Sequence, residues 1–190
     1  LNSPFTNTIP FLTEVDDQGN IVWSKQYFGF SISNCHQKPD GRIILAGTLG
    51  ENAPFLSEIN STGDVLWAKT YGLISNKVLI SGSAYNPITN EISLVGYVHW
   101  SGQTGTNTNH LVLINVDSEN GDVNWSKKNT NFNFRYPTVA YGSNSNIIVA
   151  GSIQTLDYTV YEPTLCVFSL SQNNEIEWVR RLKVDTLDLA

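Results

Sequence analysis

Apolar side chains along the chain occur in short runs that end at Gly, Asn, Asp or Pro. Some runs alternate: in DVLWAKTY, Val65, Trp67 and Lys69 fall on one side of an extended chain and the residues between them on the other. Others, such as IILAG at 43–47, are apolar throughout. Alternation is typical of a half-buried strand, and a continuous run of a strand covered on both faces. No segment has the spacing of an amphipathic helix, so the pattern predicts an all-β protein.

One motif recurs four times. Each copy has an apolar strand, a polar turn and a strand with a single tryptophan, which is Trp23, Trp67, Trp125 or Trp178. The copies are FLTEVDDQGNIVWSKQYFG (11–29), FLSEINSTGDVLWAKTYG (55–72), LVLINVDSENGDVNWSKK (111–128) and the weaker LCVFSLSQNNEIEWVRR (165–181). The tryptophans recur roughly every 50 residues, which is the period of a propeller blade of four strands.

A second motif lies between the tryptophan strands. It reads IILAG at 43–47, SLVG at 93–96 and IIVAG at 147–151, and each copy follows a turn rich in Gly, Asn or Pro. In a propeller, such runs suit inner strands between neighbouring blades, where Ala and Gly let backbones approach closely. We expect the recurring indoles to wedge between blades, each burying about 200 Å².

The two motifs together predict a β-propeller of four-stranded antiparallel blades. Residues 1–190 form a single propeller domain or a fragment of one, with a partial blade at 8–27, full blades at 31–71, 77–128 and 137–182, and a tail at 183–190. An unfinished ring would leave strand edges and apolar faces uncovered. Three solutions stay open: the tail completes a small four-bladed ring, the remaining blades lie elsewhere in a larger protein, or chains associate with one another.

The stretch PFLSEINSTGDVLWAKTYG, with later GRIILAGT-like phrases, resembles the bacterial SBBP family of seven-bladed β-propeller repeats. More loosely, NVDSENGDVNWSKK is similar to the tryptophan-docking repeat of quinoprotein-like propellers. The resemblance covers nearly the whole chain and implies the architecture, not an activity. Dehydrogenase-type quinoproteins hold their cofactor with a vicinal Cys pair and calcium-ligating carboxylates, and this chain has neither pattern. We therefore expect no cofactor.

Charged residues make up only 15% of the chain, against about 25% in ordinary soluble domains. Asn, Ser and Thr replace them, which is typical of secreted and cell-surface β proteins, so we expect an extracellular or cell-surface location. The net charge is −6, and the densest basic spot is Arg180, Arg181 and Lys183. Nucleic-acid binding is not expected, and no apolar run reaches the roughly 20 residues that span a bilayer. Because the chain contains no Met, we expect Leu1 to be a mature terminus or an internal point of a longer protein.

Residues that bear chemistry are few and dispersed. Cys35 and Cys166 lack metal-ligand spacing and are expected to be buried free thiols, with a long-range disulfide or a bond to another chain as alternatives. His99 and His110 flank one loop, but no third ligand is evident. DSENGD at 117–122 lacks the ligand set of a calcium loop and is expected to be a hairpin turn. No nucleophile elbow, P-loop or dinucleotide motif occurs, so we expect neither a metal site nor catalytic residues.

Aromatic side chains outside the repeat are the candidate binding residues. They are Trp100, His99, Tyr158 and Tyr161, which we expect on rim loops beside amide side chains that suit sugars or extended peptides. Core packing is the competing interpretation. Asn60 and Asn124 begin glycosylation sequons, and the one at Asn60 is expected to be the more accessible because it lies in a turn.

The sequence favours a non-catalytic extracellular propeller that acts as a structural or binding module through its rim loops. Its expected partner is a protein or a glycan, with self-association or a further part of the propeller as another possibility. The alternative is a carbohydrate-active or degenerate quinoprotein-like enzyme. Paired carboxylates around a central channel would indicate it. The acids to map are Glu58, Glu91, Glu119, Asp157 and Glu162.

Overall fold

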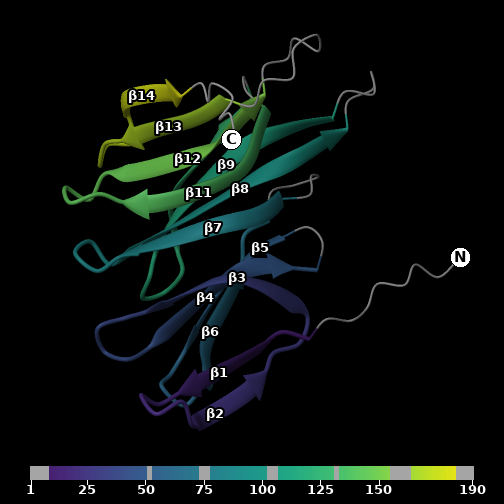
Figure 1. The fold of residues 1–190 in the computed structure, drawn as a ribbon, viewed down its shortest axis with the longest axis vertical. Helices are drawn as coiled ribbons and strands as arrows, with labels where there is room; N and C mark the ends of the chain where they lie inside the picture. The colour runs from purple at the N-terminus through teal and green to yellow at the C-terminus, as the bar shows by residue number, and fades with distance from the viewer. Residues whose placement is uncertain are drawn as a thin grey trace, which may run out of the picture.

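The protein is built from four antiparallel sheets that follow one another along the chain. A computed structural model describes residues 9–50, 53–72, 78–101, 107–130, 133–154 and 164–182. Within these residues all regular structure is β-strand (Figure 1). The first sheet consists of β1 (Phe11–Val15) and β2 (Ile21–Gln26). The second consists of β3 (Phe30–Gln37), β4 (Ile43–Leu49), β5 (Ala53–Ile59) and β6 (Val65–Thr70).

The third and fourth sheets repeat the second. The third consists of β7 (Val78–Asn86), β8 (Glu91–Ser101), β9 (Asn107–Asp117) and β10 (Val123–Asn129). The fourth consists of β11 (Asn133–Tyr141), β12 (Ile147–Gln154), β13 (Thr164–Leu170) and β14 (Ile176–Leu182). In each of these sheets the strands pair in sequence order, as in a propeller blade.

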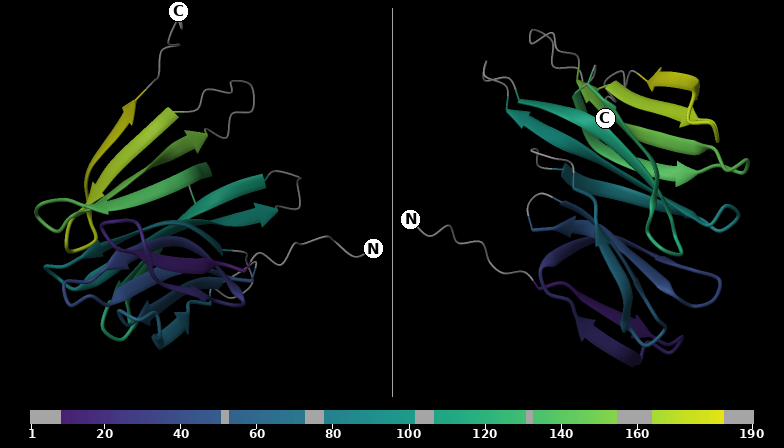
Figure 2. Two further views of the ribbon diagram at one scale, coloured as in Figure 1. Left: turned by 60° about the horizontal axis from the view of Figure 1, so that its bottom comes forward. Right: turned by 180° about the vertical axis from the view of Figure 1, so that it is seen from behind.

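The sheets are stacked in chain order, with the first at one end of the molecule and the fourth at the other (Figure 2). The predicted all-β propeller of four-stranded blades, with a partial blade at the N-terminal end, is therefore confirmed. The blade that was expected to start at residue 137 begins earlier, because β11 pairs with β12 from Asn133 onward. In the described part of the chain no helix is long and apolar enough to cross a membrane.

A cluster of buried apolar side chains lies in each interface between consecutive sheets. Tyr27, Leu45 and Ile59 are central between the first and second sheets. The second interface has Ile44, Leu56, Tyr71, Val78, Ile92, Leu94 and their neighbours, and the third has Val95, Leu111, Leu113, Phe134, Val149, Phe168 and others. The core is thus divided into layers, one per pair of blades. Burial of about 25 cal/mol per Å² of apolar surface stabilises each layer.

The continuous apolar strands are covered on both faces, as their sequence predicts. In β4, Leu45 packs toward the first sheet, whereas Ile44 and Ala46 pack toward the third. The glycine that ends the motif is required by the strand beside it in the same sheet. A Cβ on Gly47 would lie 1.8 Å from the Ser31 carbonyl oxygen, and one on Gly96 would lie 2.1 Å from that of Leu79.

The strands that begin the three full blades are joined by serine hydroxyls. β3 is irregular between Ile32 and Asn34, and β7 between Ile80 and Gly82, so one extra residue lies in each strand. Those extra residues are Ser33 and Ser81. The hydroxyl of Ser33 donates to the Ile80 carbonyl at 3.1 Å, and that of Ser81 donates to the Pro137 carbonyl at 2.5 Å. Each bulge therefore ties one blade to the next.

Both ends of the stack expose large apolar side chains. On the first sheet these are Phe11, Val15, Ile21 and Val22. On the fourth sheet they are Leu165, Ile176, Trp178, Val179 and Leu182. The equivalents of Phe11, Val15 and Leu165 in the middle sheets are buried, so exposure at these three positions marks faces that lack a neighbour among the described residues. The positions of Ile21, Val22 and Ile176 are exposed in the middle sheets as well.

Candidate functional site

The strand that carries each tryptophan also carries the residues that join one sheet to the next. Trp23, Lys25 and Tyr27 are alternate residues at the end of the first sheet, so their side chains point the same way. All three contact the β5–β6 turn of the second sheet. The Trp23 indole Nε1 donates to the Ser61 carbonyl at 2.9 Å, and the Lys25 ammonium lies 2.5 Å from an Asp64 carboxylate oxygen. The Tyr27 hydroxyl donates to the carbonyl of Gly63 in the same turn at 2.9 Å.

The second sheet repeats this arrangement against the third. Lys69 forms an ion pair with Asp122 at 2.6 Å, and the Tyr71 hydroxyl donates to the Gly121 carbonyl at 3.0 Å. Gly121 has φ +71°, and a Cβ on it would lie 2.8 Å from the Trp67 ring. We call this set, Trp, Lys and Tyr of one sheet on the glycine–aspartate turn of the next, the blade lock. It explains why each turn needs glycine: the φ is positive and the indole lies directly on the backbone.

A glutamate on the adjacent strand accepts a hydrogen bond from the indole in the first two locks. Trp23 Nε1 donates to Glu14, and Trp67 Nε1 donates to Glu58 at 3.3 Å. Glu58 is fully buried, and its charge is balanced by the buried Lys38 at 3.4 Å and by Arg42. A buried carboxylate needs such partners, because an unpaired one costs several kcal/mol.

The same cations reach across to the third sheet. Lys38 lies 2.6 Å from Glu119, and Arg42 lies 3.0 Å from it. The hydrogen bond from Lys38, together with others from Asn90 and Arg42, lowers the pKa of Glu119 to about 2. The two acids that converge here, Glu58 and Glu119, therefore share the cations Lys38 and Arg42, in an arrangement that joins the second and third sheets.

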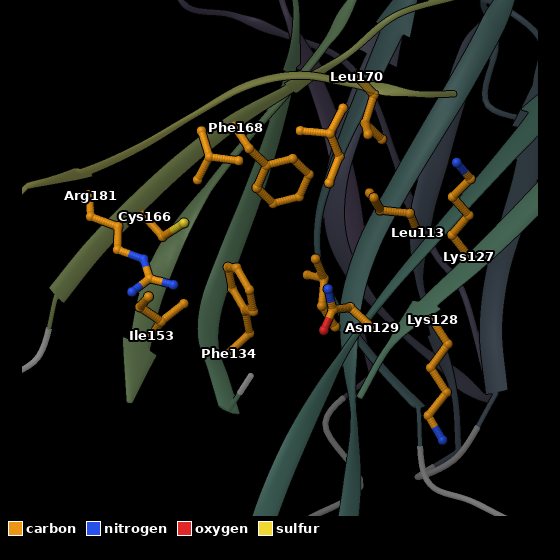
Figure 3. Close-up of a pocket in the computed structure, with 13 residues that line it drawn as sticks. Leu113, Lys127, Lys128, Asn129, Phe134, Ile153, Cys166, Phe168, Leu170 and Arg181 are labelled. Carbon is orange, nitrogen blue, oxygen red and sulfur yellow. The ribbon is translucent and has the colours of Figure 1, made fainter. Parts of the chain in front are cut away.

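The third interface has only part of the lock. Trp125 is half-buried against the core between the third and fourth sheets, and Lys127 donates to the carbonyl of Asn174 in the β13–β14 turn. Asn174 has φ +64° and takes the place of the turn glycine. The position that is tyrosine in the first two locks is Asn129. A cleft of about 410 Å³ lies beside it, between the two sheets (Figure 3).

The fourth sheet presents lock residues without a sheet against them in the described part of the chain. Trp178 is 37% exposed, and every residue of β14 is exposed. At the other end, the β1–β2 turn has Gly19 with φ +83° and no atom within 4 Å of where its Cβ would be. The equivalent glycines Gly63 and Gly121 are buried under an indole. One end thus offers the tryptophan side of a lock and the other end offers the turn.

The structure leaves the predicted rim aromatics without a described environment. The backbones of His99 and Trp100 pair with β9 in strand β8, but their side chains lie outside the described ones, and Tyr158 and Tyr161 lie outside the described residues altogether. His99 and His110 are on adjacent strands, as expected, and burial lowers the pKa of His110. No group of three or more His, Cys, Asp and Glu side chains is placed to hold a metal ion among the residues the structure describes.

The cysteines differ in part from expectation. Cys166 is a buried free thiol as predicted, but Cys35 is free and exposed. The expectation of burial is wrong for Cys35 because it shares the face of Leu45 toward the first sheet, which has two strands among the described residues to cover it. The amide oxygen of Asn60 accepts bonds from Thr62 and Asp64 within a turn that Trp23 covers, whereas Asn124 is exposed. Asn124 Nδ2 donates to the Asn115 side-chain oxygen at 2.9 Å, and the use of either sequon stays a prediction.

Of the remaining acids, only Glu91 lies among the described residues. Glu91 begins β8 and accepts from the Thr89 hydroxyl at 3.1 Å, and Asp157 and Glu162 lie outside the described residues.

Sequence reasoning identified the tryptophans but not their partners. The missing signal was in the copies themselves, since WSKQY and WAKTY place Lys and Tyr at the same distances after Trp, and a Gly-Asp pair recurs in the turns.

The chain matches no model of a known protein family and no curated protein. The functional argument therefore depends on the architecture and on the contacts between blades.

Proposed function

We propose that this protein is a non-catalytic structural and binding module, built from repeats of the SBBP kind, whose end sheets join it to further blades. The observation that carries the proposal is the blade lock, which is complete at two interfaces and open at both ends of the stack. The lock joins each sheet to the next one along the chain, and its tryptophan and tyrosine rings also pack against the core between the sheets. A stack of such sheets is stiff, since each layer is fixed by both apolar packing and directed polar contacts.

The two ends are complementary in shape and charge. Trp178 and Arg180 on β14 occupy the positions of Trp67 and Lys69, so they would dock on a turn with a positive-φ residue and a nearby acid. The β1–β2 turn at the other end has the positive-φ glycine, Asn20 stands at the position of Asp64 and Asp122, and the nearby acid is Asp17. Its Gly19 is uncovered and its Asp17 is exposed. Opposite charges on two docking surfaces steer association and fix its register.

The occupant we infer is therefore a second copy of the chain, joined head to tail. Asp16 holds the β1–β2 turn in shape by accepting bonds from the Gln18 and Asn20 amides at 3.0 Å and 2.7 Å. Asn60 does the same for the turn that Trp23 covers. A contact between unlike surfaces closes into a ring or extends into a filament, depending on the rotation between copies.

Sedimentation velocity across the micromolar range tests this assembly. The expected result is reversible association that weakens in high salt and that is reduced in both Arg180→Glu and Asp17→Lys. Mixing these two variants should restore it, because each then supplies the charge that the other lacks. Arg135→Glu, a charge reversal on an exposed side chain of β11, at the opposite edge of the fourth sheet from β14, is the matched control. A monomer at every concentration, or an equal loss in the control, would refute the proposal.

Two expectations accompany this function. The low charged fraction of 15%, with neutral amides and hydroxyls instead, supports a place outside the cell or on its surface. A protein or glycan partner at the rim loops remains a prediction, and glycan-array binding by the intact chain and by Trp100→Ala would test it.

A further inference from the structure

The interface between the third and fourth sheets differs from the others at one position of the blade lock. Four residues after the tryptophan, the first two locks have Tyr27 and Tyr71, whose rings are buried between the sheets. The third lock has Asn129. A short amide thus replaces a ring, and the turn carbonyl of Asn174 accepts from Lys127 instead of from a tyrosine hydroxyl. The space that a tyrosine would fill is left as a cleft.

The cleft has the size and the lining of a small-molecule site. Its volume is about 410 Å³, and pockets for small ligands occupy about 300–1,000 Å³. Leu111 and Leu113 lie on the side of the third sheet, and Phe134, Ile153 and Phe168 on the side of the fourth. Figure 3 shows Leu113 and Asn129 on one side of the opening and Phe134, Ile153 and Phe168 on the other. Phe134 and Phe168 meet edge to face at 6.2 Å, which gives the fourth-sheet wall a rigid aromatic surface.

The charges around the cleft are all of one sign. Lys127, Lys128 and Arg181 line it, and no Asp or Glu does. The whole chain carries a net charge of −6, so this local excess of cations is against the overall balance. An apolar cavity bordered by cations concentrates anions and favours a ligand with one anionic group on an apolar body.

We propose that this cleft binds a free anionic amphiphile, a long-chain carboxylate. Its alkyl chain lies between Leu113 and the Phe134–Phe168 pair. Its carboxylate lies toward Arg181, which pairs with Cys166 and shares its face of the fourth sheet. The site does not depend on assembly of the chain, because all of its walls belong to one copy. Each methylene that enters the cleft should tighten binding about fourfold, until the apolar space is full.

Calorimetric titration of the intact chain with saturated carboxylates, each kept below its micelle concentration, measures this directly. The expected result is one saturable site, affinity that rises with chain length and then levels off, and dodecanoate bound about tenfold more tightly than dodecanol. Absence of saturation, or equal affinity for the acid and the alcohol, would overturn the proposal. Binding of the chain to mixed phosphatidylcholine–phosphatidylserine vesicles, in place of the free acid, would also overturn it.

Asn129→Tyr provides the structural test, because it restores the residue of the other two locks. Dodecanoate affinity should fall by about tenfold or more in this variant. Ser126→Tyr, an exposed position on the same strand, is the matched control and should bind normally. The double variant Ile21→Ser/Val22→Ser removes apolar side chains from the far end of the molecule. Both Ser126→Tyr and the Ile21→Ser/Val22→Ser variant should bind dodecanoate normally. Loss of binding in either of them would place the ligand outside the cleft and refute the proposed site.

A measurement on the unaltered chain gives an independent answer. Cys166 is buried and lines the cleft, whereas Cys35 is exposed and lies in another sheet. Dodecanoate should slow alkylation of Cys166 by a small thiol reagent and leave that of Cys35 unchanged, as quantified by peptide mass spectrometry. The same rate at Cys166 with and without dodecanoate would overturn the proposal, even if the tyrosine variant failed to fold.

Discussion

Gly121 is the residue at which docking of an indole can be tested with one methyl group. It lies in the β9–β10 turn with φ +71°, and a Cβ there would be 2.8 Å and 3.0 Å from two carbons of the Trp67 ring. Gly121→Ala therefore has two costs. A non-glycine residue at positive φ loses about 1 kcal/mol, and forcing the ring away from a packed interface loses a further 1–3 kcal/mol or so.

Gly41→Ala separates these two costs. Gly41 has φ +86°, and no atom lies within 4 Å of its added Cβ, so only the backbone term applies. We expect the free energy of unfolding to fall by about 1 kcal/mol in Gly41→Ala. In Gly121→Ala we expect it to fall by about 2–4 kcal/mol.

Urea denaturation followed by circular dichroism measures both losses, with the midpoint and slope compared among variants. Adding Trp67→Leu to each glycine variant completes the cycle. Trp67→Leu should lower the free energy of unfolding less in the Gly121→Ala variant than in the unaltered chain, because in that variant it also removes the clash with the ring. The coupling free energy should be about 1 kcal/mol or more. Equal losses in Gly41→Ala and Gly121→Ala, with no coupling to Trp67, would refute the docking of the indole on the turn.

Three further predictions concern the ionic cluster and the buried glycines. Because the pKa of Glu119 is lowered from 4.5 to about 2, its stabilisation is complete above pH 4.5 or so and is lost as the pH falls through 2. Glu119→Gln should therefore lower the free energy of unfolding by about 1 kcal/mol at neutral pH, a modest loss because the Glu119 side chain is half exposed. Urea titrations should show no difference between the variant and the unaltered protein at pH 2. Lys38→Met should lower the free energy of unfolding by about 3 kcal/mol, because it leaves the buried Glu58 without that partner. The double variant Lys38→Met/Glu58→Gln should lose about half as much, and equal losses in the two variants would contradict charge pairing. The Cβ added in Gly96→Ala would lie 2.1 Å from a carbonyl oxygen, whereas the one added in Gly72→Ala meets no atom within 4 Å. The melting temperature of Gly96→Ala should therefore be far below that of Gly72→Ala, and similar melting temperatures would contradict the close approach.

The hydrophobic pattern was sufficient to predict the blades because a strand's pairing partner is its neighbour in sequence. Most connections within a sheet are short, so successive apolar runs have little choice of partner. The tryptophans could be placed between blades for a similar reason, since one indole per repeat must meet the same surroundings each time.

The contacts between blades were not predictable in the same way. Lys25 and Asp64 are separated by 39 residues, and nothing local to either one indicates the other. Cys35 looks like a core residue in sequence, and it is exposed because the sheet opposite it has two strands in the described part of the chain. The cleft beside Asn129 becomes visible in the sequence only once the tyrosines of the other two locks have been identified.

The contact between each indole and the glycine of the following turn is the central claim, and a nuclear Overhauser spectrum of the labelled chain tests it most directly. The Trp67 ring protons should show strong cross-peaks to the α-protons of Gly121, which the ring current should shift upfield, and Trp23 should show the same with Gly63. Cross-peaks from these rings only to residues of their own sheets would contradict the blade lock and every proposal built on it.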